Sequence, residues 1–245
     1  MQSVAGIHWH FEPLPWPAIV AVLGIAVVSG HLLDRAAQRR HKELAALAQR
    51  LGCRFFPEGE QGDDDACEPF RIFRRRFEIL DHVDVAMDTL VGDIDLFGGR
   101  CRLRCGDYHK GRRGRGTSNI TTRRFSYLIV QLPWRTPRLS IRREGVLDKL
   151  AAVIGFDDID FESAEFSRLF YVQSADTKFA REVLHPRMIQ FLLAERPPML
   201  DLEAGALCLS NGKRRWRPAE FEQHLAFVRR FAALWPQHLL RAPET

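Results

Sequence analysis

An uncharged apolar run near the beginning of the chain constrains its structure more than any other feature. Residues 14–33 read LPWPAIVAVLGIAVVSGHLL and contain no Asp, Glu, Lys or Arg. An α-helix of about 20 mostly apolar residues, at 1.5 Å each, spans the hydrocarbon core of a bilayer. Pro17 suits the first helical turn, where its missing N–H costs nothing. The run therefore predicts one transmembrane helix over residues 17–33, after a short tail over 1–16.

A signal peptide and a buried helix both fit this run less well. A secretory signal peptide has a basic segment before its apolar core and small residues at the cleavage point, and neither occurs here. A buried core helix of a soluble protein is disfavoured because this run is apolar on every face and lies at a terminus. Ala26 and Gly30 form a small-xxx-small pair that leaves weak homodimerisation open. The predicted anchor is marked by Pro17, Gly24, Ala26, Gly30 and Leu33.

Positive charge is distributed unevenly about this run. Residues 1–33 have no Lys or Arg and one acid, Glu12, although the whole chain has a net charge of +5. Arg35, Arg39, Arg40 and Lys42 follow the run directly. Loops that stay in the cytoplasm are enriched in Lys and Arg. We therefore expect a single-pass protein with its N-terminus outside and its main domain in the cytoplasm.

The residues after the anchor predict an α+β fold. Residues 34–52 favour a juxtamembrane amphipathic helix, because Leu44, Leu47 and Leu51 recur on one face and Gly52 can end it. We expect one cytoplasmic domain over 53–240, a mainly antiparallel sheet with helices packed on it, and a tail over 241–245.

Individual elements of this domain are predicted from local patterns. Strands are expected at 53–56, 83–91, 100–106, 125–132, 139–142 and 166–172, and a hairpin at 200–210. Residues 57–69 are acidic and lack periodicity, which predicts a loop. Helices are expected at 145–154, at 177–184 with Asp176 as N-cap, at 187–194, and from Pro218 onward.

A basic segment is the strongest candidate for a functional site. It joins two predicted strands through a turn-rich loop, residues 110–119. Its candidate contact residues are Lys110, Arg112, Arg113, Arg115, Arg123 and Arg124. Near anionic lipid headgroups, each such cation contributes about 1 kcal/mol. A solvated, charged hairpin tip is the simplest interpretation of the same residues, ahead of a headgroup contact. Nucleic-acid binding is the weakest, since Tyr108 is the only aromatic residue nearby for base stacking.

Catalytic signals are sparse. The acidic group at 157–165 (Asp157, Asp158, Asp160, Glu162 and Glu165), together with His185, leaves a metal-assisted hydrolase as an alternative. Helix capping and pairing with arginines explain the same acids. The five cysteines lack metal-ligand spacing and fit reduced thiols, and no nucleotide-binding or nucleophile motif occurs. We therefore expect no metal, no cofactor and no enzymatic activity.

Several blocks in the second half of the chain resemble a bacterial family of membrane-anchored proteins of unknown function. They are RLSIR from Arg138, GVLDKLAAVIG from Gly145, DIDFES from Asp158, and VLHPRM from Val183. The resemblance implies a single-pass protein of the bacterial plasma (inner) membrane and supplies no catalytic residues. Together these features suggest a membrane-tethered, non-enzymatic interaction or scaffold domain. Its expected partners are the bilayer, anionic headgroups and a protein or second copy, rather than nucleic acid.

Overall fold

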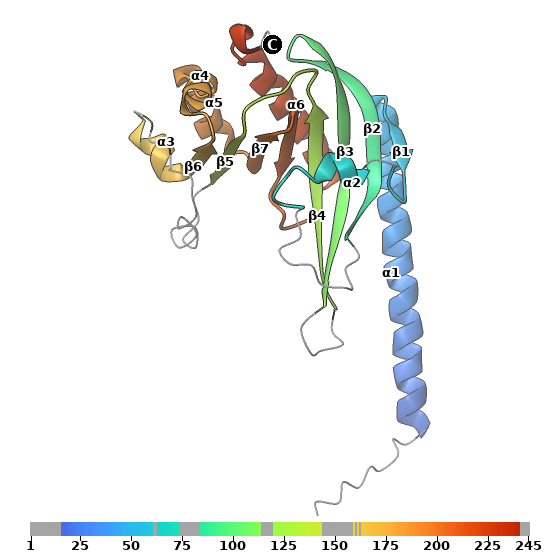
Figure 1. Cartoon of the computed structure of the whole chain (residues 1–245). Helices are drawn as coiled ribbons and strands as arrows, with labels where there is room; N and C mark the ends of the chain where they lie inside the picture. The colour runs from blue at the N-terminus through green and yellow to red at the C-terminus, as the bar shows by residue number, and fades with distance from the viewer. Residues whose placement is uncertain are drawn as a thin grey trace, which may run out of the picture. The chain divides into compact units, whose positions relative to one another are not determined.

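The computed structural model describes residues 16–60, 63–73, 84–113, 120–143, 159, 161 and 163–240. The chain has an α+β fold, with one long N-terminal helix, an antiparallel sheet and further helices (Figure 1). It divides into two compact units, Met1–Lys42 and Glu43–Thr245, which are described separately.

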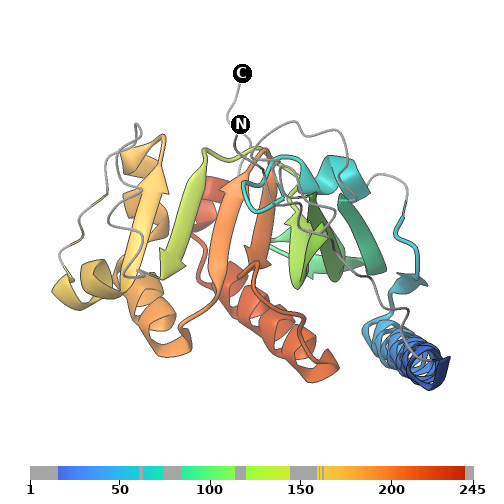
Figure 2. The same cartoon turned by 90° about the horizontal axis from the view of Figure 1, so that it is seen from below.

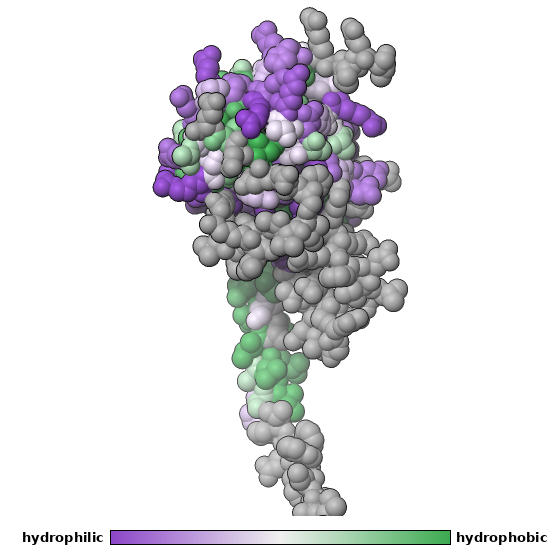
Figure 3. Space-filling model, turned by 60° about the vertical axis from the view of Figure 1, so that its left-hand side comes forward, coloured by the Kyte–Doolittle hydropathy of each residue, from purple (hydrophilic) through white to green (hydrophobic). Residues whose placement is uncertain are grey.

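The first unit consists, where it is described, of most of helix α1 (Trp16–Leu51). Among the described residues, α1 is the one helix long and apolar enough to cross a membrane. Its apolar side chains are exposed on every side, as at Trp16, Val27 and Leu33. Figure 3 shows the helix as a mostly green segment. Gly24 and Gly30 have open space around them. A helix that is apolar all round suits a lipid environment.

The last turns of α1 belong to the second unit. Leu44, Leu47 and Ala48 are fully buried there. The helix ends at Gly52, whose φ of +67° is accessible to glycine at little cost. The backbone N–H of Cys53 then donates to the carbonyl of Ala48 at 2.8 Å, which satisfies one of the last helical carbonyls.

The second unit is built on an eight-stranded sheet with the order β1-β2-β3-β4-β8-β7-β5-β6, and every neighbouring pair is antiparallel. The strands are β1 (Arg54–Phe56), β2 (Asp84–Leu96), β3 (Gly99–Arg113), β4 (Ile120–Gln131), β5 (Leu139–Arg143), β6 (Phe170–Ser174), β7 (Met199–Glu203) and β8 (Ala206–Ser210). The shorter helices are α2 (Asp63–Cys67), α3 (Ala164–Leu169), α4 (Thr177–Val183), α5 (Pro186–Glu195), α6 (Pro218–Ala233) and the 3₁₀ helix η2 (Gln237–Leu240).

Each face of the sheet carries its own core. Figure 2 shows α5 and α6 along one face and α2 on the other. The larger core joins sheet residues such as Leu128 and Leu209 to Val228 and Phe231 of α6. The smaller core lies beside α2, where the ring of Phe73 packs on Tyr108, Phe125 and Tyr127. Burying one such side chain contributes about 1.5–3 kcal/mol.

Two-residue turns join the β2–β3 and β7–β8 hairpins. Phe97–Gly98 and Ala204–Gly205 have positive φ at both positions, the geometry of a type I′ turn. Phe97 adopts this costly conformation with a buried ring, which packs edge-on to Trp235 at 5.4 Å. The hairpin predicted at residues 200–210 is confirmed.

Besides the loop expected at 110–119, whose first residues belong to β3, two further sequence predictions are wrong. The loop expected at residues 57–69 contains α2, whose last residue Cys67 is buried beside Phe70 in the smaller core. The strand expected at 166–172 begins with α3, because Ser163 caps the backbone N–H of Phe166 at 3.3 Å and the buried Phe166 ring stacks on Phe170. The strand itself, β6, starts only at Phe170. The helix predicted at 145–154 lies outside the described residues.

Candidate anion-contacting surface

The predicted basic hairpin is present as the paired strands β3 and β4. Lys110 lies opposite Arg123 in the ladder, and Arg112 lies opposite Thr121. Lys110, Arg112 and Arg113 belong to β3 rather than to a loop, because β3 continues to Arg113. Arg115 lies outside the described residues. The hairpin therefore brings two separated basic runs onto neighbouring strands.

Arg123 and Arg124 are exposed on β4. In the described part of the chain, neither guanidinium contacts a carboxylate. Directly opposite Arg124 lies His109, which is half-buried. Burial first, and then the positive charges of Arg124 and Arg215, lower the pKa of His109, although Asp107 acts in the opposite direction. The charges of Arg124 and Arg215 thus act on His109 from nearby.

A second basic element, which the sequence patterns did not predict, is the segment Lys213–Arg217 between β8 and α6. It reads KRRWR and differs from a random charge run in having a fully buried Trp216 near its centre. Ser126 of β4 holds this segment. Its backbone N–H donates to the carbonyl of Arg214 at 3.1 Å, and its Oγ accepts from the backbone N–H of Trp216 at 2.8 Å.

The same serine connects the segment to a buried charge. Ser126 Oγ donates to Oδ1 of Asp107 at 2.5 Å, and both residues are fully buried. Ser210 Oγ donates to the Ser126 carbonyl at 2.8 Å. Nη1 of Arg215 lies 3.9 Å from the second oxygen of Asp107. These contacts hold the basic segment against β4.

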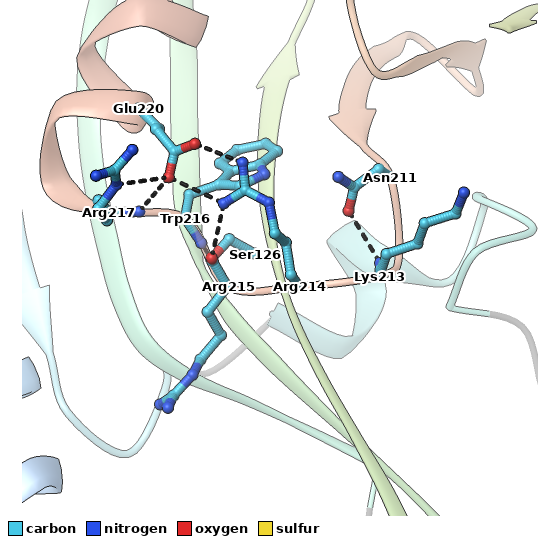
Figure 4. Close-up of polar contacts among 8 residues, drawn as sticks. All are labelled: Ser126, Asn211, Lys213, Arg214, Arg215, Trp216, Arg217 and Glu220. Atoms are coloured by element: carbon cyan, nitrogen blue, oxygen red, sulfur yellow. Dashed lines mark hydrogen bonds and ion pairs between the residues drawn. The ribbon is translucent and has the colours of Figure 1, made fainter.

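Glu220 forms ion pairs with two of the arginines, Arg214 and, at 3.6 Å from its Nε, Arg217. Arg214 donates to both of its oxygens, at 3.0 and 2.5 Å, and the backbone N–H of Arg217 donates at 2.7 Å, which caps α6 (Figure 4). The hydrogen bond from Arg214 is the main reason that the pKa of Glu220 falls to about 2. Figure 4 shows the side chains of Lys213 and Arg215 extending away from this carboxylate.

Four cations consequently remain with little compensation at this end of the sheet. We name Arg123, Arg124, Lys213 and Arg215 the cationic strip, which runs along the end of the sheet. Arg123 and Arg124 are consecutive on β4, so their side chains leave opposite faces of the sheet at that end. In the described residues Lys213 has no ion pair, and Arg215 has only the distant Asp107. The strip sits on strand pairing and a buried hydrogen-bond network, so its charges are presented on a rigid base. The sequence signal that could have indicated it is Trp216, an aromatic residue inside a basic run.

The hydrolase candidates are not brought together in the described residues. Asp157, Asp158, Asp160 and Glu162 lie outside them, and Glu165 is exposed on α3. His185 caps α5: Nδ1 accepts from the backbone N–H of Met188 at 3.4 Å, and Nε2 lies 3.0 Å from the Leu234 carbonyl. The part of the chain that is described holds no group of three His, Cys, Asp or Glu able to bind a metal ion. The five cysteines are free thiols, and burial raises the pKa of Cys105 and Cys208.

Comparison with known proteins gives a fold likeness. No family model matches the chain, and no curated protein matches it. The crystal structure of the mycobacterial trehalose monomycolate transport factor A is similar, with a TM-score of 0.50 and 12% sequence identity. The match covers 84% of this chain and 97% of that one. The chain thus shares its fold with a mycobacterial transport factor.

Proposed function

We propose that this protein is a membrane-tethered, non-enzymatic interaction or scaffold protein whose cationic strip contacts anionic lipid headgroups. The observation that carries the proposal is the strip itself, a set of cations with few acidic partners held in place by strand pairing and a buried hydrogen bond. The same chain has an apolar helix long enough to cross a membrane. In this proposal α1 is a single-pass anchor in a bacterial inner membrane, with the domain on the cytoplasmic side because the cations follow the apolar run.

The fold likeness supports an accessory role rather than catalysis. The similar protein is named a transport factor. A tether that positions a domain at the membrane for a transport process is compatible with the charge and the anchor of this chain. The aromatic residue of the basic segment, Trp216, is buried and unable to stack on bases, which favours headgroups over single-stranded nucleic acid.

Replacing three cations of the strip tests the lipid contact. In full-length protein reconstituted in vesicles, we expect Arg123→Gln, Arg124→Gln and Lys213→Gln together to lower photo-crosslinking to anionic headgroups at least tenfold, because each cation contributes about 1 kcal/mol. Crosslinked peptides are measured by mass spectrometry, in vesicles with and without anionic phospholipid.

A matched control removes the same charge elsewhere. Arg168, Arg187 and Arg229 are exposed on α3, α5 and α6, and their replacement by Gln should leave the crosslinking of the strip unchanged. Equal crosslinking in neutral and anionic vesicles would contradict the proposal. If the strip instead bound RNA or DNA with a steep salt dependence, nucleic-acid binding would replace lipid contact as the proposed function.

A further inference from the structure

A hollow of about 230 Å³ lies at the opposite end of β3 from the cationic strip. Its lining is formed by Gly52, Arg54, Val91, Gly92, Asp93, Arg100 and Arg102. Arg102 and His109 are seven residues apart on β3, or roughly 23 Å at 3.3 Å per residue. The hollow, which we name the arginine pocket, is therefore a separate feature.

The pocket lies on the face of the sheet away from α6. Leu90 and Cys105 pair across β2 and β3 and belong to the core that α6 completes. Side chains alternate along a strand, so Val91, Asp93 and Arg102 point to the other face. Strand pairing fixes their neighbours, since Asp93 lies opposite Arg102 and Arg54 lies opposite Val91.

The cations of the pocket outnumber its acids. Three arginines line it, against the single carboxylate of Asp93. Arg100 and Arg102 share that carboxylate. Nη2 of Arg100 lies 3.5 Å from Oδ2 of Asp93, and Nε of Arg102 lies 3.4 Å from Oδ1. Arg54 lies 3.7 Å from Glu60, which Arg104 contacts more closely, at 2.8 Å. The lining therefore carries a net charge of about +2 at neutral pH.

The guanidinium groups also have spare hydrogen-bond donors. Each guanidinium has five N–H groups in a planar fork. Within the described residues, Arg100 and Arg102 make loose ion pairs with Asp93 and no directed hydrogen bond from a guanidinium N–H. Their exposed fractions of 76% and 46% leave both forks free to turn toward a ligand.

The shape of the pocket selects a small ligand. Its volume is below that of sites for drug-sized molecules, about 300–1,000 Å³. Gly52 and Gly92 contribute no side chain to the lining. Arginine forks match the paired oxygens of phosphate groups better than any other side chain.

We propose that the arginine pocket binds a phosphate-type oxyanion between Arg54, Arg100 and Arg102. Asp93 holds the two β3 arginines when the pocket is empty and competes with the ligand for them. The phosphate group belongs either to a soluble phosphate compound or to a lipid headgroup with a terminal phosphate. The pocket does not depend on the lipid contact of the cationic strip.

Calorimetric titration of the full-length protein in detergent with pyrophosphate, at constant ionic strength, tests the proposal. We expect binding that weakens at least tenfold when Arg100→Gln and Arg102→Gln are combined. We expect Asp93→Asn to tighten binding several-fold, because it removes the competing carboxylate. Arg187→Gln and Glu165→Gln, at exposed positions elsewhere, serve as charge controls and should alter affinity less than twofold.

A second arm of the experiment separates the two sources of phosphate. Vesicles containing phosphatidate present a terminal phosphate on a lipid. Binding to pyrophosphate alone indicates a soluble phosphate compound, whereas binding to phosphatidate as well indicates that a lipid headgroup can supply the phosphate. Circular dichroism verifies that the variants remain folded. Affinity that is unchanged by the arginine pair, or no binding to either form of phosphate, would overturn the proposal.

Discussion

At the scale of single residues, Ser126 has more structural consequences than its size suggests. Its N–H donates to Arg214, and its carbonyl accepts from Ser210. Its hydroxyl donates to Asp107 and accepts from the backbone N–H of Trp216. A buried carboxylate requires such donors because its desolvation is otherwise costly. The hydroxyl therefore stabilises the buried charge and orders the basic segment at once.

His224 of α6 makes the stability of this region sensitive to pH. Its ring packs 4.1 Å from that of Trp216, and burial is the main cause that lowers its pKa to about 4, with Arg214 adding to the effect and Glu220 opposing it. In the unfolded chain the pKa is about 6.5. The folded state thus resists protonation, and its stability should fall as the pH decreases from 6.5 to 4, by up to about 3 kcal/mol.

Urea denaturation of the full-length protein in detergent at pH 7 and at pH 4.5 measures this effect. The His224→Gln variant should lose less stability between the two pH values than the wild type, whatever its stability at pH 7. If both proteins lost the same amount, the pH dependence would come from other groups.

At the scale of elements, an irregularity in β2 alters the pairing of the long β2–β3 hairpin. The register of β2 against β3 shifts between Met87 and Leu90, and Asp88 has a φ of +51°. Gly106 of β3 lies directly against this bulge. An added Cβ there would be 2.9 Å from the carbonyl oxygen of Asp88 and 2.9 Å from Cα of Thr89. Since both are backbone atoms, the contact cannot be relieved by a side-chain rotation.

Gly106→Ala should therefore destabilise the protein by about 1–3 kcal/mol through overpacking. Gly99→Ala provides the control on the same strand, because its added Cβ would meet Pro133 at an ordinary 3.5 Å. Thermal unfolding of both variants gives the comparison. Equal melting temperatures would show that the bulge adapts to the methyl group.

At the scale of the whole molecule, function depends on whether α1 holds the domain at a membrane. Arginine at the centre of a transmembrane helix costs about 2.5–3.5 kcal/mol. Val22→Arg combined with Ile25→Arg should release the protein from the membrane fraction after alkaline carbonate extraction, whereas the wild type should require detergent. Gln223→Arg with Ala226→Arg, at exposed positions on α6, controls for added charge. Wild-type protein recovered without detergent would contradict the anchor.

Local signals were enough to predict the α+β fold, the long apolar helix and most of the C-terminal half. Asp176 and Pro186 mark the starts of α4 and α5, and Gly205 marks the β7–β8 turn. The buried positions of α6 follow from their spacing, as at Phe221 and Val228. Such signals act between residues a few positions apart, so the chain carries them before it folds.

Only the tertiary structure placed the basic segment and the arginine pocket. Ser126 and Trp216, whose hydrogen bond holds the basic segment, are 90 positions apart. In the pocket, Arg54 of β1 meets arginines of β3 because β2 pairs with both strands. The amino-acid sequence by itself determined the apolar helix and the regular elements, since these depend on periodicity and caps. Which cations lie together depends on strand pairing and burial between distant segments, which no local pattern encodes.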